Sequence, residues 1–174
     1  AVTVVYGPGD PSFNRLGLKD VIRAIGNSPK PVILALKQNF PERYKRKVGL
    51  LGGNMMTAFK AAGCVGVLSD GPSRDVDEIR PMGIQYMLTG VTPGHGDFAV
   101  QAINVPVSIC GMDVMPGEIV HMDENGACKF PAQEIDEVIR RASELQKVEQ
   151  IRMEKMAKET DPEVILKIIS GLYD

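Results

Sequence analysis

The stretch that decides the fold is VGLLGGNMMTAFKAAGCVGVLSDG, Val48 to Gly71. Its apolar residues Val48–Leu51 predict a strand, Gly52-Gly53 a turn, Asn54–Ala62 a short helix, and Cys64–Ser69 a second strand. A strand, a glycine turn, a helix and another strand in this order are typical of parallel strands joined by a right-handed crossover. The stretch therefore predicts an α/β fold.

The residues before this stretch continue the same pattern. The apolar runs Ala1–Tyr6 and Pro31–Leu36 predict two further strands, and the turn residues GPGDPS close the first of them. Between them, apolar residues at helical spacing predict a helix within Asn14–Asn27. The charged segment Lys37–Lys47 is interpreted as a solvated connector rather than a binding patch.

The residues after it change in character. Ile84–Pro93 predicts a strand and a loop, and Ile103–Phe130 has short apolar runs broken by the turns GMDVMPGE and DENG, as in an antiparallel meander. From Pro131 the chain is helical, and a second helix runs from Asp161, which precedes a proline, to Gly171. The long helix carries an apolar stripe of Ile135, Val138, Ile139, Ala142, Leu145, Val148 and Ile151.

These elements predict a layered α/β sandwich with C-terminal helices. We expect a core domain at residues 1–130 and a helical extension at residues 131–174 that packs on the core or on a neighbouring subunit. Because the chain begins inside a strand without an initiator Met, we also expect that N-terminal sequence is missing.

Composition excludes several classes of protein. The 174 residues carry a net charge of −2, so no broad basic field favours nucleic acid or an anionic membrane, and no apolar run approaches the length of a membrane-spanning helix. Cys64, Cys110 and Cys128 are far apart and lack the spacing of a metal site. They are predicted to be buried free thiols in a reducing compartment, which favours the cytoplasm.

The turn Gly52-Gly53-Asn54-Met55 is the first candidate site. Free backbone N–H groups at the start of a helix can hold a carboxylate or a phosphate, although glycines here can also serve only the geometry of a tight turn. The turn is neither a P-loop nor a dinucleotide fingerprint, because no Gly-Lys-Ser/Thr follows and the glycine spacing is wrong.

The adjacent pair Arg74-Asp75 is the second candidate. Loops that follow neighbouring parallel strands meet at one edge of a sheet, so this pair is expected to face the glycine turn across a cleft. The Arg side chain is a planar fork for carboxylate or enolate oxygens, and the Asp side chain is a hard ligand for Mg²⁺. In the alternative interpretation, Asp75 or Asp77 caps a helix and Arg74 is solvated.

Taken together, these motifs resemble the family named for regulator of ribonuclease activity A. Its members combine a Gly-Asp/Glu turn with a short helix, a GxxGVVxDGxxRD motif and a VPVxxxGxxVxPGDxxxxDxxGVxxxP block. Gly52–Asp75 matches the first part, NVPVSICGMDVMPGEIVHMDENGACKFP matches the block, and AVTVVYGPGD is similar to the family's opening. The family includes 4-hydroxy-4-methyl-2-oxoglutarate aldolases and oxaloacetate decarboxylases.

The resemblance implies a β/β/α swivelling-type domain in a homotrimer or homohexamer, with sites at subunit boundaries. It also implies that the missing N-terminal segment is helical. It implies that Arg74 holds a pyruvyl oxygen, that Asp75 anchors Mg²⁺ or Mn²⁺ partly through water, and that the turn amides hold the substrate carboxylate. One departure concerns Gly53, which replaces the acidic residue of the family's turn. Neither Gly53 nor the neighbouring Asn54 can transfer a proton as a carboxylate does, which weakens the aldolase interpretation in particular.

Three other polar residues have open roles. Asp70 either orients Arg74 or only begins a turn, and His95 lies in a glycine-rich loop that either reaches a site or is solvated. His121 is interpreted as a strand residue without a chemical role. Neither histidine belongs to a zinc-type cluster.

The sequence supports two classes of function. The first is a Mg²⁺- or Mn²⁺-dependent lyase that acts on a small 2-oxo acid, with decarboxylation favoured over retro-aldol cleavage because of Gly53. The second is a non-catalytic regulator that binds a ribonuclease on the same scaffold, and an enzyme with a different substrate is a third alternative. Partners are expected to be the substrate and further copies of the chain, with no nucleic acid and no membrane.

Overall fold

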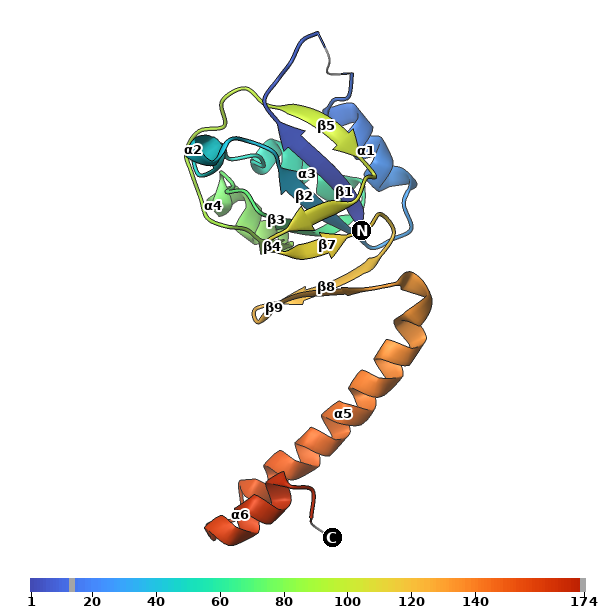
Figure 1. The fold of residues 1–174 in the computed structure, drawn as a ribbon, viewed down its shortest axis with the longest axis vertical. Helices are drawn as coiled ribbons and strands as arrows, with labels where there is room; N and C mark the ends of the chain where they lie inside the picture. Colours follow the sequence, from blue (N-terminus) through green and yellow to red (C-terminus); the bar gives the residue numbers. More distant parts are fainter. Residues whose placement is uncertain (13–14, 173–174) are drawn as a thin grey trace. The chain divides into compact units, whose positions relative to one another are not determined.

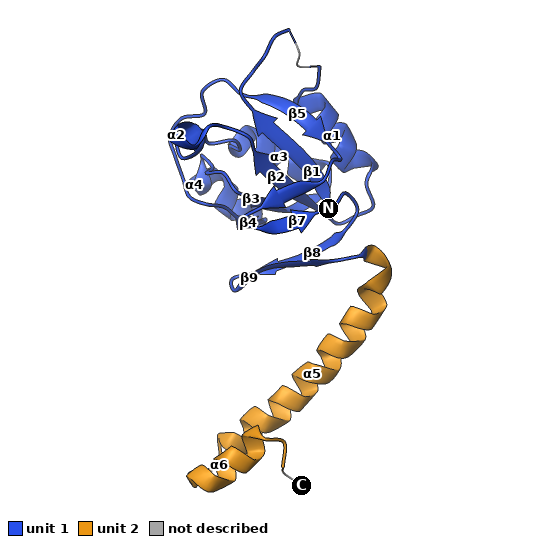
Figure 2. Ribbon diagram, in the orientation of Figure 1, with its two compact units in different colours: residues 1–131 blue, residues 132–174 orange. Residues whose placement is uncertain are grey.

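The computed structural model describes residues 1–12 and 15–172, in two compact units, residues 1–131 and 132–174 (Figure 2). The strands of the first unit are β1 (Val2–Gly7), β2 (Val32–Gln38), β3 (Cys64–Ser69), β4 (Gln85–Met87), β5 (Ala99–Ile103), β6 (Val107–Ile109), β7 (Met112–Val114), β8 (Ile119–Asp123) and β9 (Gly126–Phe130). Its α-helices are α1 (Leu18–Asn27), α2 (Glu42–Lys45), α3 (Gly53–Ala61) and α4 (Val76–Ile79). Asn14, where the predicted first helix starts, lies outside the described residues.

A five-stranded sheet organises the first unit, with the strand order β4-β3-β2-β1-β5 (Figure 1). Strands β1 to β4 run parallel to one another, and β5 pairs antiparallel with β1. The remaining strands form the antiparallel hairpins β6-β7 and β8-β9. The predicted antiparallel pairing of residues 103–130 is therefore confirmed, as two separate hairpins rather than one meander.

The two faces of the sheet have different partners. Buried side chains of α1 and α3, such as Ile25 and Phe59, share one apolar cluster with Leu34 of β2. The next residue of β2, Ala35, faces the other way and packs in a second cluster with residues of the β-hairpins, such as Ile109. This layering confirms the predicted α/β fold class.

The strand prediction for Val48–Leu51 is wrong. These residues are buried, but they form an irregular loop between α2 and α3. Their apolar character reflects burial beneath the following loops, and a short apolar run does not distinguish a buried loop from a strand. The parallel crossover that contains α3 therefore starts at β2. The charged segment Lys37–Lys47, which was predicted to be a solvated connector, contains the short helix α2.

The prediction of three buried thiols is correct only for Cys64. All three cysteines are free, but Cys110 and Cys128 are exposed. Cys128 lies on β9, where alternate side chains point to opposite faces, and Cys110 follows β6 in the hairpin turn with a φ of 50°. The apolar residues around Cys110 and Cys128 in the sequence do not indicate that these two side chains face solvent.

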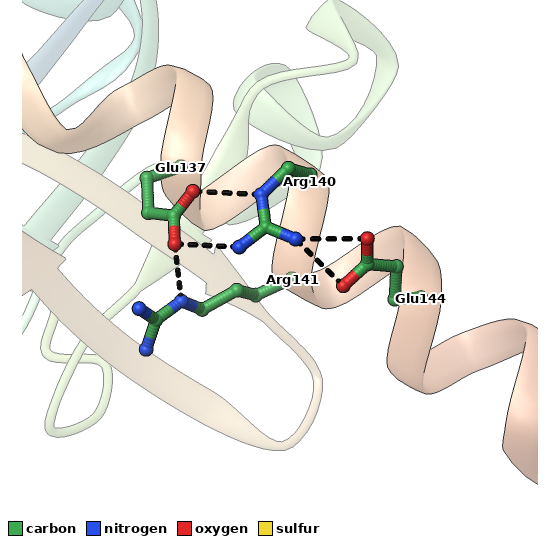
Figure 3. Close-up of polar contacts among 4 residues, drawn as sticks. All are labelled: Glu137, Arg140, Arg141 and Glu144. Atoms are coloured by element: carbon green, nitrogen blue, oxygen red, sulfur yellow. Dashed lines mark hydrogen bonds and ion pairs between the residues drawn. The ribbon is translucent and has the colours of Figure 1, made fainter.

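The second unit consists of α5 (Ile135–Met156) and α6 (Pro162–Ile169). The side chain of Asp161 caps α6 by accepting a hydrogen bond from Glu163 N (2.9 Å). In the first half of α5, Glu137 bonds Arg140 and Arg141, and Arg140 also bonds Glu144 (Figure 3). Hydrogen bonds from the two arginines lower the pKa of Glu137 to about 2. No helix of the described residues is both long and apolar enough to cross a membrane.

Candidate active site at the Gly52-Gly53 turn

The candidate site is built on three loop segments, residues 48–52, 72–75 and 90–92, which lie beyond β2, β3 and β4 in the chain. Backbone hydrogen bonds join them side by side: Leu50 N to Pro72 O (3.2 Å), Arg74 N to Leu51 O (2.8 Å), Ser73 N to Gly90 O (3.0 Å) and Thr92 N to Ser73 O (2.9 Å). We call this arrangement the loop ladder. Because it consists of main-chain bonds, it fixes the path of Arg74 and Asp75 next to the glycine turn.

The structure brings Asp75 and the glycine turn into direct contact. Helix α3 begins at Gly53, and the N-cap residue Gly52 has no side chain to satisfy the free amides. Asp75 Oδ2 accepts a hydrogen bond from Gly53 N (3.0 Å). The carboxylate thus lies at the N-terminus of α3, the positive end of the helix dipole. The Gly53 amide, assigned by the resemblance to the substrate carboxylate, is here bonded to Asp75.

Gly52 is required for this close approach. A Cβ atom at this position would lie 2.4 Å from Asp75 Oδ2 and 2.8 Å from Arg74 Nη2. Both polar groups therefore occupy the space that any larger residue would need. The first glycine of the turn has a steric reason to be glycine, independent of its backbone angles.

The Arg74 side chain packs against the same turn. Its Nε donates to Gly49 O (3.2 Å), and a Cβ atom on Gly49 would come within 2.6 Å of Arg74 Cγ. The guanidinium is thereby held against Gly52, which Asp75 Oδ2 also approaches. A cationic fork and a carboxylate converge on one turn.

Asp75 adopts the left-handed backbone conformation, with φ 55° and ψ 39°. It is the N-cap residue of the four-residue helix α4, but its side chain makes no capping bond to that helix. Its carboxylate bonds the start of α3 instead. Asp77 lies in the first turn of α4. Non-glycine residues with positive φ are uncommon and are concentrated at functional sites.

Sequence reasoning missed a polar pair next to Arg74. Ser73 is fully buried, and its Oγ donates to Leu51 O (2.9 Å) and lies 2.5 Å from Tyr86 Oη. Burial raises the pKa of Tyr86 to about 12. The pair joins β4 to the loop ladder. The only available signal was that Ser73 immediately precedes Arg74, which does not indicate a contact thirteen residues away.

The other candidate residues lie elsewhere. Asp70 accepts hydrogen bonds from Lys37 Nζ (2.6 Å) and Gln38 N (2.7 Å), so its carboxylate ties the ends of β2 and β3 together rather than orienting Arg74. His95 is exposed and contacts Phe98 edge-on.

The loop that contains His95 is nevertheless connected to the site, because Gly49 N donates to Gly94 O (2.9 Å). His121 is exposed on β8, 3.7 Å from Asp123. Two cavities flank Gly90 and Val91, and neither is lined by the glycine turn or by Arg74.

With this geometry in view, comparison with known proteins identifies the family. A model of RraA-like proteins, described as Aldolase/RraA, matches residues 1–128. The chain belongs to the RraA-like family. The matched region coincides with most of the first unit, which contains the whole candidate site.

Similar proteins differ in what their names describe. This RraA-like chain is 31% identical over 91 residues to a 4-hydroxy-4-methyl-2-oxoglutarate aldolase of Thermus thermophilus, covering 49% of the chain and 52% of the relative. It is 28% identical over 125 residues to an uncharacterized protein of Methanocaldococcus jannaschii, covering 71% of the chain and 60% of the relative. The chain thus spans between half and two thirds of the length of these relatives.

A solved structure shares the fold. The RraAS2 protein of Streptomyces coelicolor, described as an unusual member of the RNase ES inhibitor RraA protein family, has a TM-score of 0.68 at 23% identity. The match covers 86% of this chain and 72% of that one. The RraA-like family thus includes proteins named as aldolases and proteins named as ribonuclease inhibitors.

The site of this RraA-like chain has donors that suit a hydrated Mg²⁺ or Mn²⁺. Asp75 is exposed and offers a hard carboxylate, and no group of three or more His, Cys, Asp or Glu residues forms a metal cage in the part of the chain that the structure describes. Mg²⁺ keeps several waters and needs only one or two protein carboxylates, whereas a structural zinc site needs four protein ligands. The donor chemistry therefore fits the cation that the resemblance implied.

Proposed function

We propose that the chain is a divalent-cation-dependent lyase that cleaves a carbon–carbon bond of a small 2-oxo acid through a pyruvate enolate. The observation that supports this best is the convergence of Arg74 Nη2 and Asp75 Oδ2 on Gly52 at the N-terminus of α3. An arginine fork, an exposed carboxylate and helix amides within one turn suit a substrate that carries both a carboxylate and a developing oxyanion.

Each group has a distinct task. Asp75 holds the cation, which supplies an electron sink at the 2-oxo group when bound. Arg74 donates to the enolate oxygen, and its bond to Gly49 O keeps the guanidinium from rotating away. The amides of Asn54 and Met55 remain for the substrate carboxylate, because Gly53 N is bonded to Asp75.

The alternative is a protein-binding regulator on the same scaffold, which the name of the Streptomyces relative favours. A regulator has no need of an arginine and a carboxylate that both approach one glycine turn, which is why we favour the lyase. A third alternative, an enzyme with another substrate, shares the same site and differs only in what lies beyond the pyruvyl half.

The test is direct. Purified protein with MgCl₂ or MnCl₂ is given oxaloacetate or a 4-hydroxy-2-oxo acid, and pyruvate is followed by coupling to lactate dehydrogenase. We expect the protein with metal to release pyruvate faster than the metal salt releases it without protein. Pyruvate at only the metal-alone rate from both substrates, together with stoichiometric capture of a ribonuclease, would establish the regulator instead.

A further inference from the structure

A side-chain hydroxyl connects the two halves of the candidate site. Gly52 directly follows Leu51 in the chain, and Arg74 directly follows Ser73. Ser73 Oγ donates to Leu51 O (2.9 Å), so this bond lies one residue before each half of the site. Arg74 N donates to the same carbonyl oxygen (2.8 Å). The separation between the glycine turn and Arg74 is therefore set next to Ser73.

The phenol of Tyr86 holds the Ser73 hydroxyl from the other side. Tyr86 lies on the edge strand β4, and its Oη is 2.5 Å from Ser73 Oγ. Ser73 Oγ has one proton, and Leu51 O is a nearer acceptor for it than Arg74 O (3.2 Å). Because burial raises the pKa of Tyr86 to about 12, the phenol keeps its proton at neutral pH and can donate it to Ser73. We call the two bonds, from Tyr86 Oη to Ser73 Oγ and from Ser73 Oγ to Leu51 O, the hydroxyl chain.

The hydroxyl chain is shielded from water and close to the charges of the site. Ser73 is fully buried. Besides burial and the bond to Ser73, the charge of Arg74 lowers the pKa of Tyr86 and the charge of Asp75 raises it. The phenol thus lies within electrostatic reach of both groups. Hydrogen bonds in series strengthen one another where water is excluded. The main-chain bonds of the loop ladder join the loops to one another, whereas the hydroxyl chain ties them to a strand of the sheet.

We propose that the hydroxyls of Tyr86 and Ser73 are positioning groups that set the separation between the glycine turn and Arg74, an inference that rests on the proposed lyase function. Neither hydroxyl contacts the substrate, and both act through the main chain at Leu51 and Arg74. Since Arg74 donates to the enolate oxygen that forms during the reaction, a displacement of this residue slows the chemical step more than it weakens substrate binding.

Tyr86→Phe tests the phenol, because it removes one oxygen atom and keeps the ring. A misplacement of about 1 Å can cost on the order of 10²-fold in rate, so a smaller shift should lower kcat on the order of tenfold and change KM by less than about threefold. Tyr44→Phe is the matched control, an exposed tyrosine of α2 that should lose its hydroxyl without loss of activity. A kcat for Tyr86→Phe equal to that of the wild type would overturn the assignment.

A double variant separates positioning from stability. Ser73→Ala strands the phenol of Tyr86 without its partner, so the melting temperature should fall. Adding Tyr86→Phe removes the stranded group, and the melting temperature should then recover, because replacing both partners by apolar groups is nearly neutral. We expect kcat of the double variant to stay on the order of tenfold or more below that of the wild type. Recovery of kcat together with the melting temperature would show that the pair contributes only to stability.

Hydrogen exchange gives a measurement that does not need turnover. Gly53 N donates to Asp75 Oδ2 across the site (3.0 Å), so this amide reports on whether the two halves stay together. In the double variant it should exchange at least about fivefold faster, while the amide of Val67, within β3, should keep its rate.

The exchange measurement also distinguishes the two proposals. If the wild type releases no pyruvate from either substrate, the lyase proposal fails, and the exchange of the Gly53 amide decides on the positioning role. Unchanged exchange of this amide in the double variant would overturn the positioning role and leave a measured lyase activity standing.

Discussion

At the scale of single residues, some groups of the site could be predicted from the sequence and others could not. Arg74, Asp75 and the glycine turn could be predicted, because their spacing is fixed along a strand–turn–helix unit whose geometry is common to parallel sheets. The contact of Ser73 with Tyr86 could not be predicted in the same way. It depends on how the loop ladder and β4 are arranged in space, and spacing along the chain does not encode that arrangement.

Asp75→Asn should abolish metal-dependent pyruvate release, with a loss on the order of 10²-fold or more. Asn tolerates the left-handed backbone at this position and its Oδ1 can still accept from Gly53 N, so the fold should be retained. Arg74→Lys should also be damaging, because a point charge cannot replace a forked contact. Coupled assays with circular dichroism as the control for folding check both variants, and activity near the wild-type level in Asp75→Asn would exclude Asp75 as the cation ligand.

Gly52→Ala should disable the site more than it disturbs the fold. The new methyl group would meet Asp75 Oδ2 and Arg74 Nη2, so both side chains must move, and displacements of this size cost on the order of 10²-fold in rate. Gly9→Ala is the control, since nothing lies within 4 Å of its added Cβ. The measurement is kcat/KM together with the melting temperature of each variant. Full activity in Gly52→Ala would show that the close approach is not needed.

The three thiols should separate into two classes. Burial raises the pKa of Cys64, so at pH 8 little of it is thiolate and the side chain is also shielded, whereas Cys110 and Cys128 are exposed. Reaction with a disulfide reagent should therefore titrate Cys110 and Cys128 quickly and Cys64 only after unfolding. Cys110→Ser should remove one of the fast equivalents. Rapid reaction of all three thiols in the native protein would contradict this burial.

At the scale of elements, the spacing of apolar residues and the helix-capping residues located most helices and strands. The exact limits of these elements and the irregular segments were harder to predict from the sequence. The cap at Asp161 and the proline after it placed the start of α6 correctly. Val48–Leu51 was mistaken for a strand because a buried loop and a buried strand present the same apolar run. The edge strand β5 had no prediction of its own, since pairing with β1 is a long-range contact that its short sequence does not specify.

The ion-pair cluster on α5 should respond to acid in a defined direction. The folded-state pKa of Glu137 is about 2, below its ordinary value of 4.5, so the support it gives to the helix is present above pH 4.5 and is lost as the pH falls through about 2. Nuclear magnetic resonance of the Glu137 side-chain carboxyl checks the midpoint. Arg140→Gln should raise it by removing the first of the two arginine partners (Figure 3). A midpoint near 4.5 in the wild type would show that the pairs do not persist in solution.

At the scale of the whole molecule, the exposed apolar side chains of α6 bear on assembly. Leu166 and Ile169 are each 55% exposed. Exposed apolar side chains that lie together on one helix are typical of a surface that a partner covers. We expect a trimer or a dimer of trimers by light scattering at micromolar concentration. Leu166→Ser with Ile169→Ser should lower the measured mass, and Met115→Ser, an exposed apolar residue of the first unit, should not. A monomeric wild type would contradict this expectation.

The loop ladder has a consequence for how such a protein can change over evolutionary time. Its rungs are hydrogen bonds between the main chains of segments 48–52, 72–75 and 90–92, so many substitutions of side chains in these segments can leave the rungs in place. A substitution near the turn that keeps these bonds can then change the chemistry of the site while the main chain stays in place. A change of chemistry on this scaffold need not pass through an unfolded intermediate.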